Sequence, residues 1–92
     1  MKVTFYATLR DVVGGRSADF SLPPDATVQD LLDEMIRCYP AIGRELLNEE
    51  GELHPHVHLF INGRDAPYLE QGLNTPLDPE DTITVFPAVG GG

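Results

Sequence analysis

The stretch Ala26-Thr27-Val28-Gln29-Asp30-Leu31-Leu32 opens the one long amphipathic segment of the chain and decides its fold. Apolar residues recur from here at the i, i+3, i+4, i+7 spacing that predicts a helix with one buried stripe. The stripe consists of Val28, Leu31, Leu32, Met35, Ile36 and Tyr39. Thr27 is suited to cap the first turn, with Asp30 three residues on. Pro40 is expected to end the helix.

Two strand patterns precede this helix. Apolar and polar residues alternate from Val3 to Leu9 and again from Ser17 to Leu22, as half-buried strands require. Gly14-Gly15 predicts the turn between them, and Pro23-Pro24 stops the second strand. We therefore expect a β-hairpin before the helix.

Further strands follow the helix. The alternation from Val57 to Ile61, closed by Asn62-Gly63, predicts a third strand, and Thr82 to Phe86 predicts the last one. A short helical turn is expected near Ile42 to Leu47, whereas Arg64 to Pro76 has too little periodicity to assign. This order predicts an α+β fold, a mixed sheet with one main helix packed on one face.

The charge and the cysteine content of the chain indicate which classes of ligand and which compartment to expect. Fifteen acidic residues stand against six basic ones, a net charge of −9, which argues against nucleic acid and anionic membranes as ligands. A basic protein partner fits this charge, although acidity also keeps a small protein dissolved. No apolar run approaches the length of a membrane span, and the first residues show no signal-peptide pattern, so a cytoplasmic location is expected. The single Cys38 cannot form an internal disulfide, which agrees with a reducing compartment. Near the end of the helix, Cys38 is expected to be packed and unreactive.

The chain ends in Phe86-Pro87-Ala88-Val89-Gly90-Gly91-Gly92. Glycine loses the most conformational entropy on ordering, so we expect a domain over residues 1–87 and a flexible tail over 88–92. Without Cβ atoms, Gly91 and Gly92 can enter a narrow channel and deliver the Gly92 carboxylate there. A frayed terminus is the alternative interpretation.

Three aromatic residues, Tyr6, Phe60 and Phe86, are expected on the strand face that points away from the helix. Exposed aromatics on neighbouring strands are typical of a binding surface. The alternatives are scattered surface aromatics or a patch covered in a homodimer.

His54, His56 and His58 alternate along the chain and could share one face of a strand. A transition metal is conceivable at such a spacing. No carboxylate or cysteine lies at ligand spacing, however, so we expect surface imidazoles and no metal site.

Several of these segments resemble the ubiquitin-like sulfur carriers of the molybdopterin synthase small subunit and thiamine sulfur carrier family, which have the β-grasp fold. The resemblance covers nearly the whole chain and lies in residues 2–10, 26–32, 57–63 and 86–92. The terminal diglycine after a strand ending in Phe86-Pro87 is its most specific part. Ala88 replaces a second proline common in the family, and Gly90 stands where many members have alanine, serine or threonine.

The resemblance implies that the chain is a carrier and not an enzyme, with no cofactor of its own. An E1-like partner would grip the aromatic face at Phe86, Tyr6 and Phe60 and thread the tail, from Val89 and Gly90 to Gly91, into its active site. There Mg-ATP would convert Gly92 into an acyl-adenylate, and a persulfide would turn it into a thiocarboxylate.

Three fates of the activated Gly92 are considered. The first is sulfur donation in molybdenum cofactor biosynthesis, with the large catalytic subunit of molybdopterin synthase as partner. The second is sulfur donation to cysteine or another thio-metabolite. In the third, the chain is a protein modifier joined through Gly92 to target lysines.

Overall fold

Helix α2 (Val28–Cys38) begins at the cap that the sequence predicts. In the computed structural model, which describes residues 1–88, Thr27 Oγ1 accepts the Asp30 N–H at 3.3 Å, and the Asp30 carboxylate accepts the Thr27 N–H at 2.9 Å. This capping box satisfies two backbone donors that a helix start otherwise leaves unpaired. The face of α2 that includes Leu31 and Met35 is buried against the sheet.

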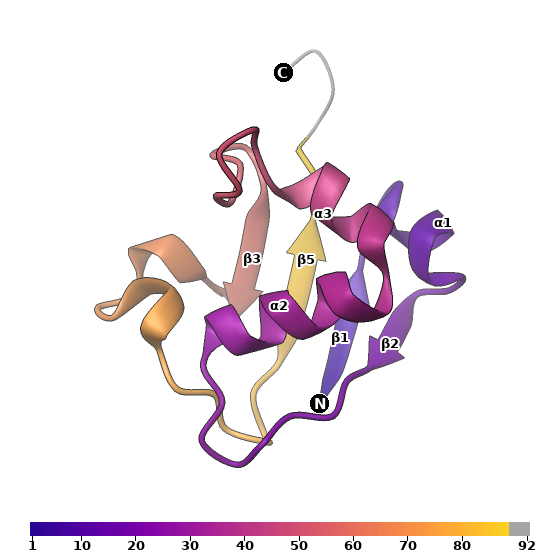
Figure 1. Cartoon of the computed structure of the whole chain (residues 1–92). Helices are drawn as coiled ribbons and strands as arrows, with labels where there is room; N and C mark the ends of the chain where they lie inside the picture. Colours follow the sequence, from indigo (N-terminus) through magenta and orange to yellow (C-terminus); the bar gives the residue numbers. More distant parts are fainter. Residues whose placement is uncertain (89–92) are drawn as a thin grey trace.

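The sheet has five strands in the order β2-β1-β5-β3-β4. They are β1 (Lys2–Phe5), β2 (Ser17–Asp19), β3 (His58–Ile61), β4 (Arg64–Asp65) and β5 (Ile83–Phe86). Strands β1 and β5 pair in parallel, while every other neighbouring pair is antiparallel. The predicted mixed sheet and the antiparallel pairing of β1 with β2 are confirmed (Figure 1). The predicted tight turn at Gly14-Gly15 is wrong, because a short helix at residues 9–13 joins the two strands and Gly14 ends that helix.

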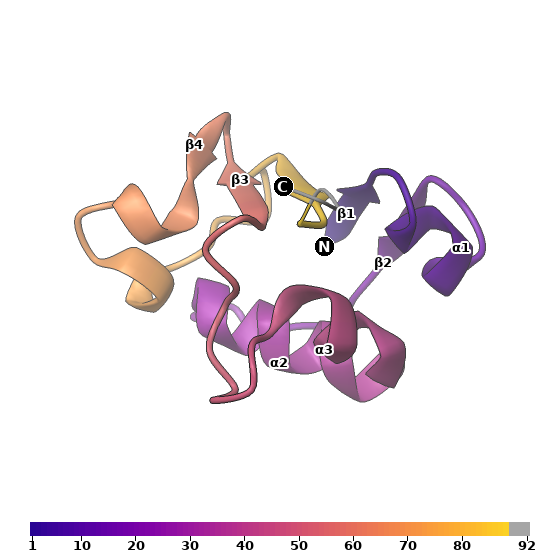
Figure 2. The same ribbon diagram turned by 90° about the horizontal axis from the view of Figure 1, so that it is seen from above.

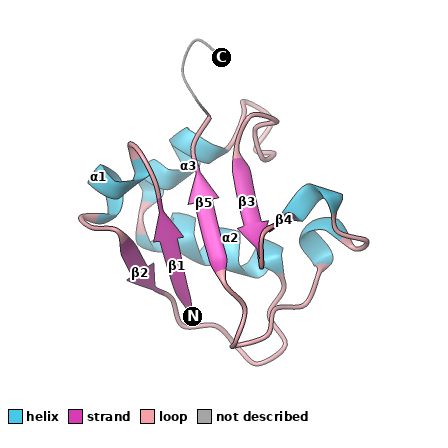
Figure 3. Cartoon of the chain, turned by 180° about the vertical axis from the view of Figure 1, so that it is seen from behind, coloured by secondary structure: helices cyan, strands magenta, loops and turns pink. Residues whose placement is uncertain are grey.

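Helices cover one side of this sheet. Figure 2 shows α2 and α3 (Pro40–Leu46) together on the same side, and Figure 3 shows the strands from the opposite side, in front of α2. The shorter helices are α1 (Leu9–Val13) and the 3-10 turns η1 (Ala66–Tyr68) and η2 (Gly72–Asn74). Within residues 1–88, no helix is long and apolar enough to cross a membrane.

The predicted first strand is too long. Strand β1 ends at Phe5, Ala7 has a positive φ of 55°, and Leu9 begins α1 instead of continuing the strand. The error has a physical cause, because Leu9, Val12 and Val13 also fit a helical spacing of i, i+3, i+4. Helical packing buries Leu9 completely.

Other expectations need smaller corrections. Strand β2 ends at Asp19, although Phe20 remains buried and its N–H donates to the Met1 carbonyl at 2.8 Å. Cys38 is exposed and not packed, because it lies one turn after Glu34 on the surface side of α2, with Sγ 3.6 Å from the Glu34 carboxylate. The segment 64–76, unassigned from sequence, holds β4, η1 and η2.

The hairpin between β3 and β4 turns at Asn62-Gly63, as predicted. Both residues have positive φ, 54° and 83°, which is the geometry of a two-residue turn that matches strand twist. Asn62 further anchors the turn, since its Oδ1 accepts the Thr82 N–H and its Nδ2 donates to Asp81, both at 2.8 Å.

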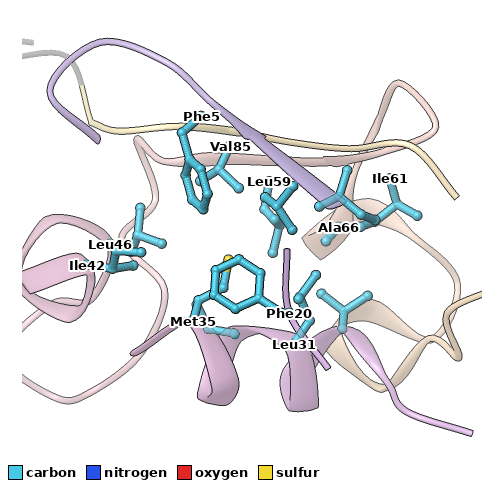
Figure 4. Close-up of a cluster of buried hydrophobic side chains, with 14 of the residues drawn as sticks. Phe5, Phe20, Leu31, Met35, Ile42, Leu46, Leu59, Ile61, Ala66 and Val85 are labelled. Carbon is cyan, nitrogen blue, oxygen red and sulfur yellow. The ribbon is translucent and has the colours of Figure 1, made fainter. Parts of the chain in front are cut away.

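A single apolar core fills the space between helix and sheet (Figure 4). Phe20 contacts Phe5 and Tyr39 edge to face, with ring centroids 6.3 and 6.1 Å apart. Among the described residues, none of the buried side chains is polar or charged. The core therefore stabilises the fold but supplies no chemistry.

Replacing Thr27 with alanine tests the helix cap. We expect Thr27→Ala to lower the free energy of unfolding by about 1 kcal/mol, because it removes the side-chain acceptor at the N-cap. Urea unfolding measures the change. Thr8→Ala is the matched control, since Thr8 caps α1 without a side-chain hydrogen bond. Equal losses in the two variants would contradict the assigned role of Thr27.

Candidate functional site

The structure brings Tyr6, Phe60 and Phe86 together on the sheet face opposite α2. The Tyr6 and Phe86 rings stack with centroids 4.4 Å apart and planes inclined by 13°. Phe60 meets Phe86 edge to face at 5.8 Å and 80°. All three side chains are half-buried, each partly covered by its neighbours. We call these three residues the aromatic cluster.

Strand register explains why the rings meet. Phe5 lies opposite Val85 in the parallel pair, and both point into the core. The next residues along each strand, Tyr6 and Phe86, therefore face outward. The Tyr6 N–H donates to the Val85 carbonyl at 3.1 Å, which holds Tyr6 beside β5.

Two polar side chains flank the aromatic cluster. At one end, Arg10 Cζ lies 4.7 Å from the Tyr6 ring centroid, and Arg10 Nε donates to the Phe5 carbonyl at 2.8 Å. At the other end, the His58 ring stacks on Phe60 at 5.5 Å. The cluster is thus the middle of a longer strip that ends in a cation and an imidazole.

Sequence reasoning missed the flanking role of both polar residues. His58 could have been placed, because it alternates with Phe60 on the same strand and so shares its face. Arg10 could not, since its position depends on α1, whose first residue, Leu9, we expected to continue the strand.

The three histidines do not converge. His58 Nδ1 lies 2.8 Å from the Asp65 carboxylate, while His54 and His56 contact each other with centroids 5.3 Å apart. Across residues 1–88, no three His, Cys, Asp or Glu side chains are grouped so that they could hold a metal ion.

Glu34 and Arg37 form a pair on the surface of α2 that shifts the pKa of each group. The hydrogen bonds from Arg37, at 2.6 and 2.7 Å, lower the pKa of Glu34, and the same contacts raise the pKa of Arg37. Arg37 is exposed and Glu34 is half-buried, so this is an ion pair on the helix surface.

The aromatic cluster lies where the chain leaves the sheet. Strand β5 ends at Phe86, Pro87 is buried, and Ala88 is half-buried against the core. The predicted tail residues Val89, Gly90, Gly91 and Gly92 lie outside the described residues. A protein bound to the cluster would therefore contact the chain beside the start of that segment.

Comparison with known proteins finds a matching family and relatives that align over the whole chain. A family model described as the ThiS family matches residues 3–92. Small archaeal modifier protein 3 of Haloferax volcanii is 40% identical over 92 residues, which are 100% of this chain and 98% of that protein.

Solved structures share the fold over nearly their full length. The crystal structure of SAMP1 from Haloferax volcanii has a TM-score of 0.84 at 32% identity, covering 100% of this chain and 98% of its own. A chain of the Amycolatopsis orientalis BexX/CysO complex has a TM-score of 0.78 at 30% identity, covering 99% of this chain and 98% of its own. A putative molybdopterin converting factor, subunit 1, from Pyrococcus furiosus has a TM-score of 0.74 at 27% identity, covering 96% of this chain and 95% of its own.

Truncating the central ring tests whether the aromatic cluster is separate from the folding core. We expect Phe86→Ala to lower the free energy of unfolding by about 1–2 kcal/mol, through the loss of two partly exposed ring contacts. Leu59→Ala, at a fully buried site, should cost about 2–5 kcal/mol. Urea unfolding compares the two variants. A larger loss at Phe86 would make it a core residue.

Proposed function

Because this chain belongs to the ThiS family and has its ubiquitin-like β-grasp fold, we propose that it is a sulfur carrier loaded at Gly92. An E1-like enzyme activates the Gly92 carboxylate, and the chain itself is the substrate in that reaction. The domain presents the tail, and the partner supplies ATP, Mg²⁺ and the catalytic residues.

The chemistry follows from the weakness of a carboxylate as an electrophile. Attack of a Gly92 carboxylate oxygen on the α-phosphate of ATP forms an acyl-adenylate and releases pyrophosphate. The outer sulfur of a partner persulfide then attacks the Gly92 carbonyl carbon and expels AMP. A second partner thiol reduces the resulting acyl disulfide, which leaves a thiocarboxylate on Gly92 and a disulfide on the donor.

The position of the aromatic cluster carries this proposal. Tyr6, Phe60 and Phe86 form an apolar surface at the end of β5, directly before the segment that ends in Gly92. Partly exposed aromatic groups of this kind are preferred anchors of protein interfaces. A partner that binds them would hold the tail at its root, and its active site could then receive Gly91 and Gly92.

The fate of the activated Gly92 has more than one candidate. Identity of 40% to a small archaeal modifier protein favours, as second function, an amide bond between Gly92 and a lysine of a target protein. The likeness to the chain in the BexX/CysO complex supports the other alternative, sulfur donation in the biosynthesis of cysteine or another thio-metabolite. Service in molybdenum cofactor biosynthesis, with the large subunit of molybdopterin synthase, stays a prediction supported by the 27% identity to a putative converting factor.

The intact mass of the protein, purified from its own cells without thiols, tests the proposal. We expect a species in which one oxygen is replaced by sulfur, with the change in the peptide that ends in Gly92. A variant lacking Gly91 and Gly92 should keep the fold and show no such species. A bare carboxylate throughout, with Gly92 recovered in branched peptides on other proteins, would make the chain a modifier instead.

A charge in the aromatic cluster should block docking of the activating enzyme. We expect Phe86→Asp to weaken this binding about 30-fold or more, as burying an unpaired carboxylate in an interface costs about 2 kcal/mol or more. Titration calorimetry with the E1-like enzyme from the same organism measures the affinity. Tyr68→Asp is the matched control, since Tyr68 is 86% exposed and lies outside the cluster. Equal affinity of both variants would exclude the cluster as the interface.

A further inference from the structure

A groove opens on the helix side of the molecule, away from the aromatic cluster. Its apolar walls come from α2, from the segment 47–53 and from the region of η1 and η2, and include Leu32, Ile36, Leu53 and Leu73. Its volume is about 370 Å³, within the range of about 300–1,000 Å³ typical of binding pockets. We call it the helix groove.

One wall of the helix groove is an ordered turn, although the sequence shows only a polar loop there. Leu47 and Leu53 pair as an antiparallel bridge, and the Asn48 N–H donates to the Glu52 carbonyl at 2.8 Å. Asn48 Oδ1 accepts the N–H groups of Glu50 and Glu52, both at 3.0 Å. Figure 2 shows this segment, between α3 and β3, reaching down beside α2. The groove is therefore formed in the free domain.

The rim of the helix groove is acidic. Asp33 lies on the α2 side and Glu52 on the opposite wall, and no lysine, arginine or histidine is among the described residues that line it. The nearby Arg37 is bound to Glu34 by two hydrogen bonds. Glu49 and Glu50, both exposed, extend the negative charge along the turn.

We propose that the helix groove docks a segment of a partner protein in which an aliphatic side chain stands between lysines or arginines. The aliphatic side chain would lie against the leucine and isoleucine walls, while Asp33 and Glu52 pair with the flanking cations. Acidic residues at the rim and a chain charge of −9 attract such a segment and repel an acidic one.

The helix groove and the aromatic cluster lie far enough apart that a partner in the groove does not cover the surface proposed for the activating enzyme. The groove lies among the helices, whereas the aromatic cluster lies on the opposite face of the sheet. Both surfaces can be occupied at once. A partner in the groove can thus stay bound while another protein works on the tail.

An NMR titration with short capped peptides tests the inference. We expect a peptide in which lysines alternate with leucine and isoleucine to shift the amide signals of Leu32, Ile36 and Leu53. Peptides with glycine in place of the aliphatic residues, or glutamate in place of lysine, should leave these signals unchanged. Equal shifts with the glycine peptide, or none with the first peptide, would overturn the proposal, as would shifts caused by raising the concentration of the protein alone.

Charge reversal at the rim gives a second readout. Glu52→Lys should weaken binding of the lysine-leucine peptide about tenfold, since like charges across an interface repel. Glu80→Lys is the matched control, an exposed acid outside the groove. Phe86→Asp should bind the peptide as the unmodified chain does, so failure at the groove and failure at the aromatic cluster are distinguished. Equal affinity of the two lysine variants would contradict the assigned rim.

Discussion

The parallel pairing of β1 with β5 is the contact on which the rest of the structure depends. It joins the first strand to the last and places them at the centre of the sheet, with β2 and β3 on either side. Because the two strands run in the same direction, their ends meet at one edge. Tyr6 and Phe86 stack there, and the segment that ends in Gly92 begins there.

Much of this arrangement could be predicted from local patterns. The 3.6-residue period with Thr27 and Asp30 specified α2, and strict alternation identified the outward side of Phe60 and Phe86. Leu9 was misassigned because it satisfies both periods, and the choice between them is made by tertiary burial. The position of Arg10 beside Tyr6 follows from this helix, so the strand pattern could not predict it. The helix groove depends on the hydrogen bonds of Asn48, which no periodicity reveals.

The two faces of the domain suit different ligands. The aromatic cluster offers flat ring surfaces beside the cation of Arg10, whereas the helix groove offers aliphatic walls beside carboxylates. The apolar core lies between these surfaces. Such a division fits the proposed carrier function, in which the domain binds partner proteins through its surface and its described buried residues include no polar side chain.

The central position of β5 also bears on how the protein is made. Residues 83–86 are synthesised after the other four strands, yet β1 and β3 both pair with them through backbone hydrogen bonds. The sheet therefore cannot close while those residues are still inside the ribosome. A product that terminated before residue 83 would lack both Phe86 and the middle of the sheet, so it would not fold into a domain that presents the aromatic cluster.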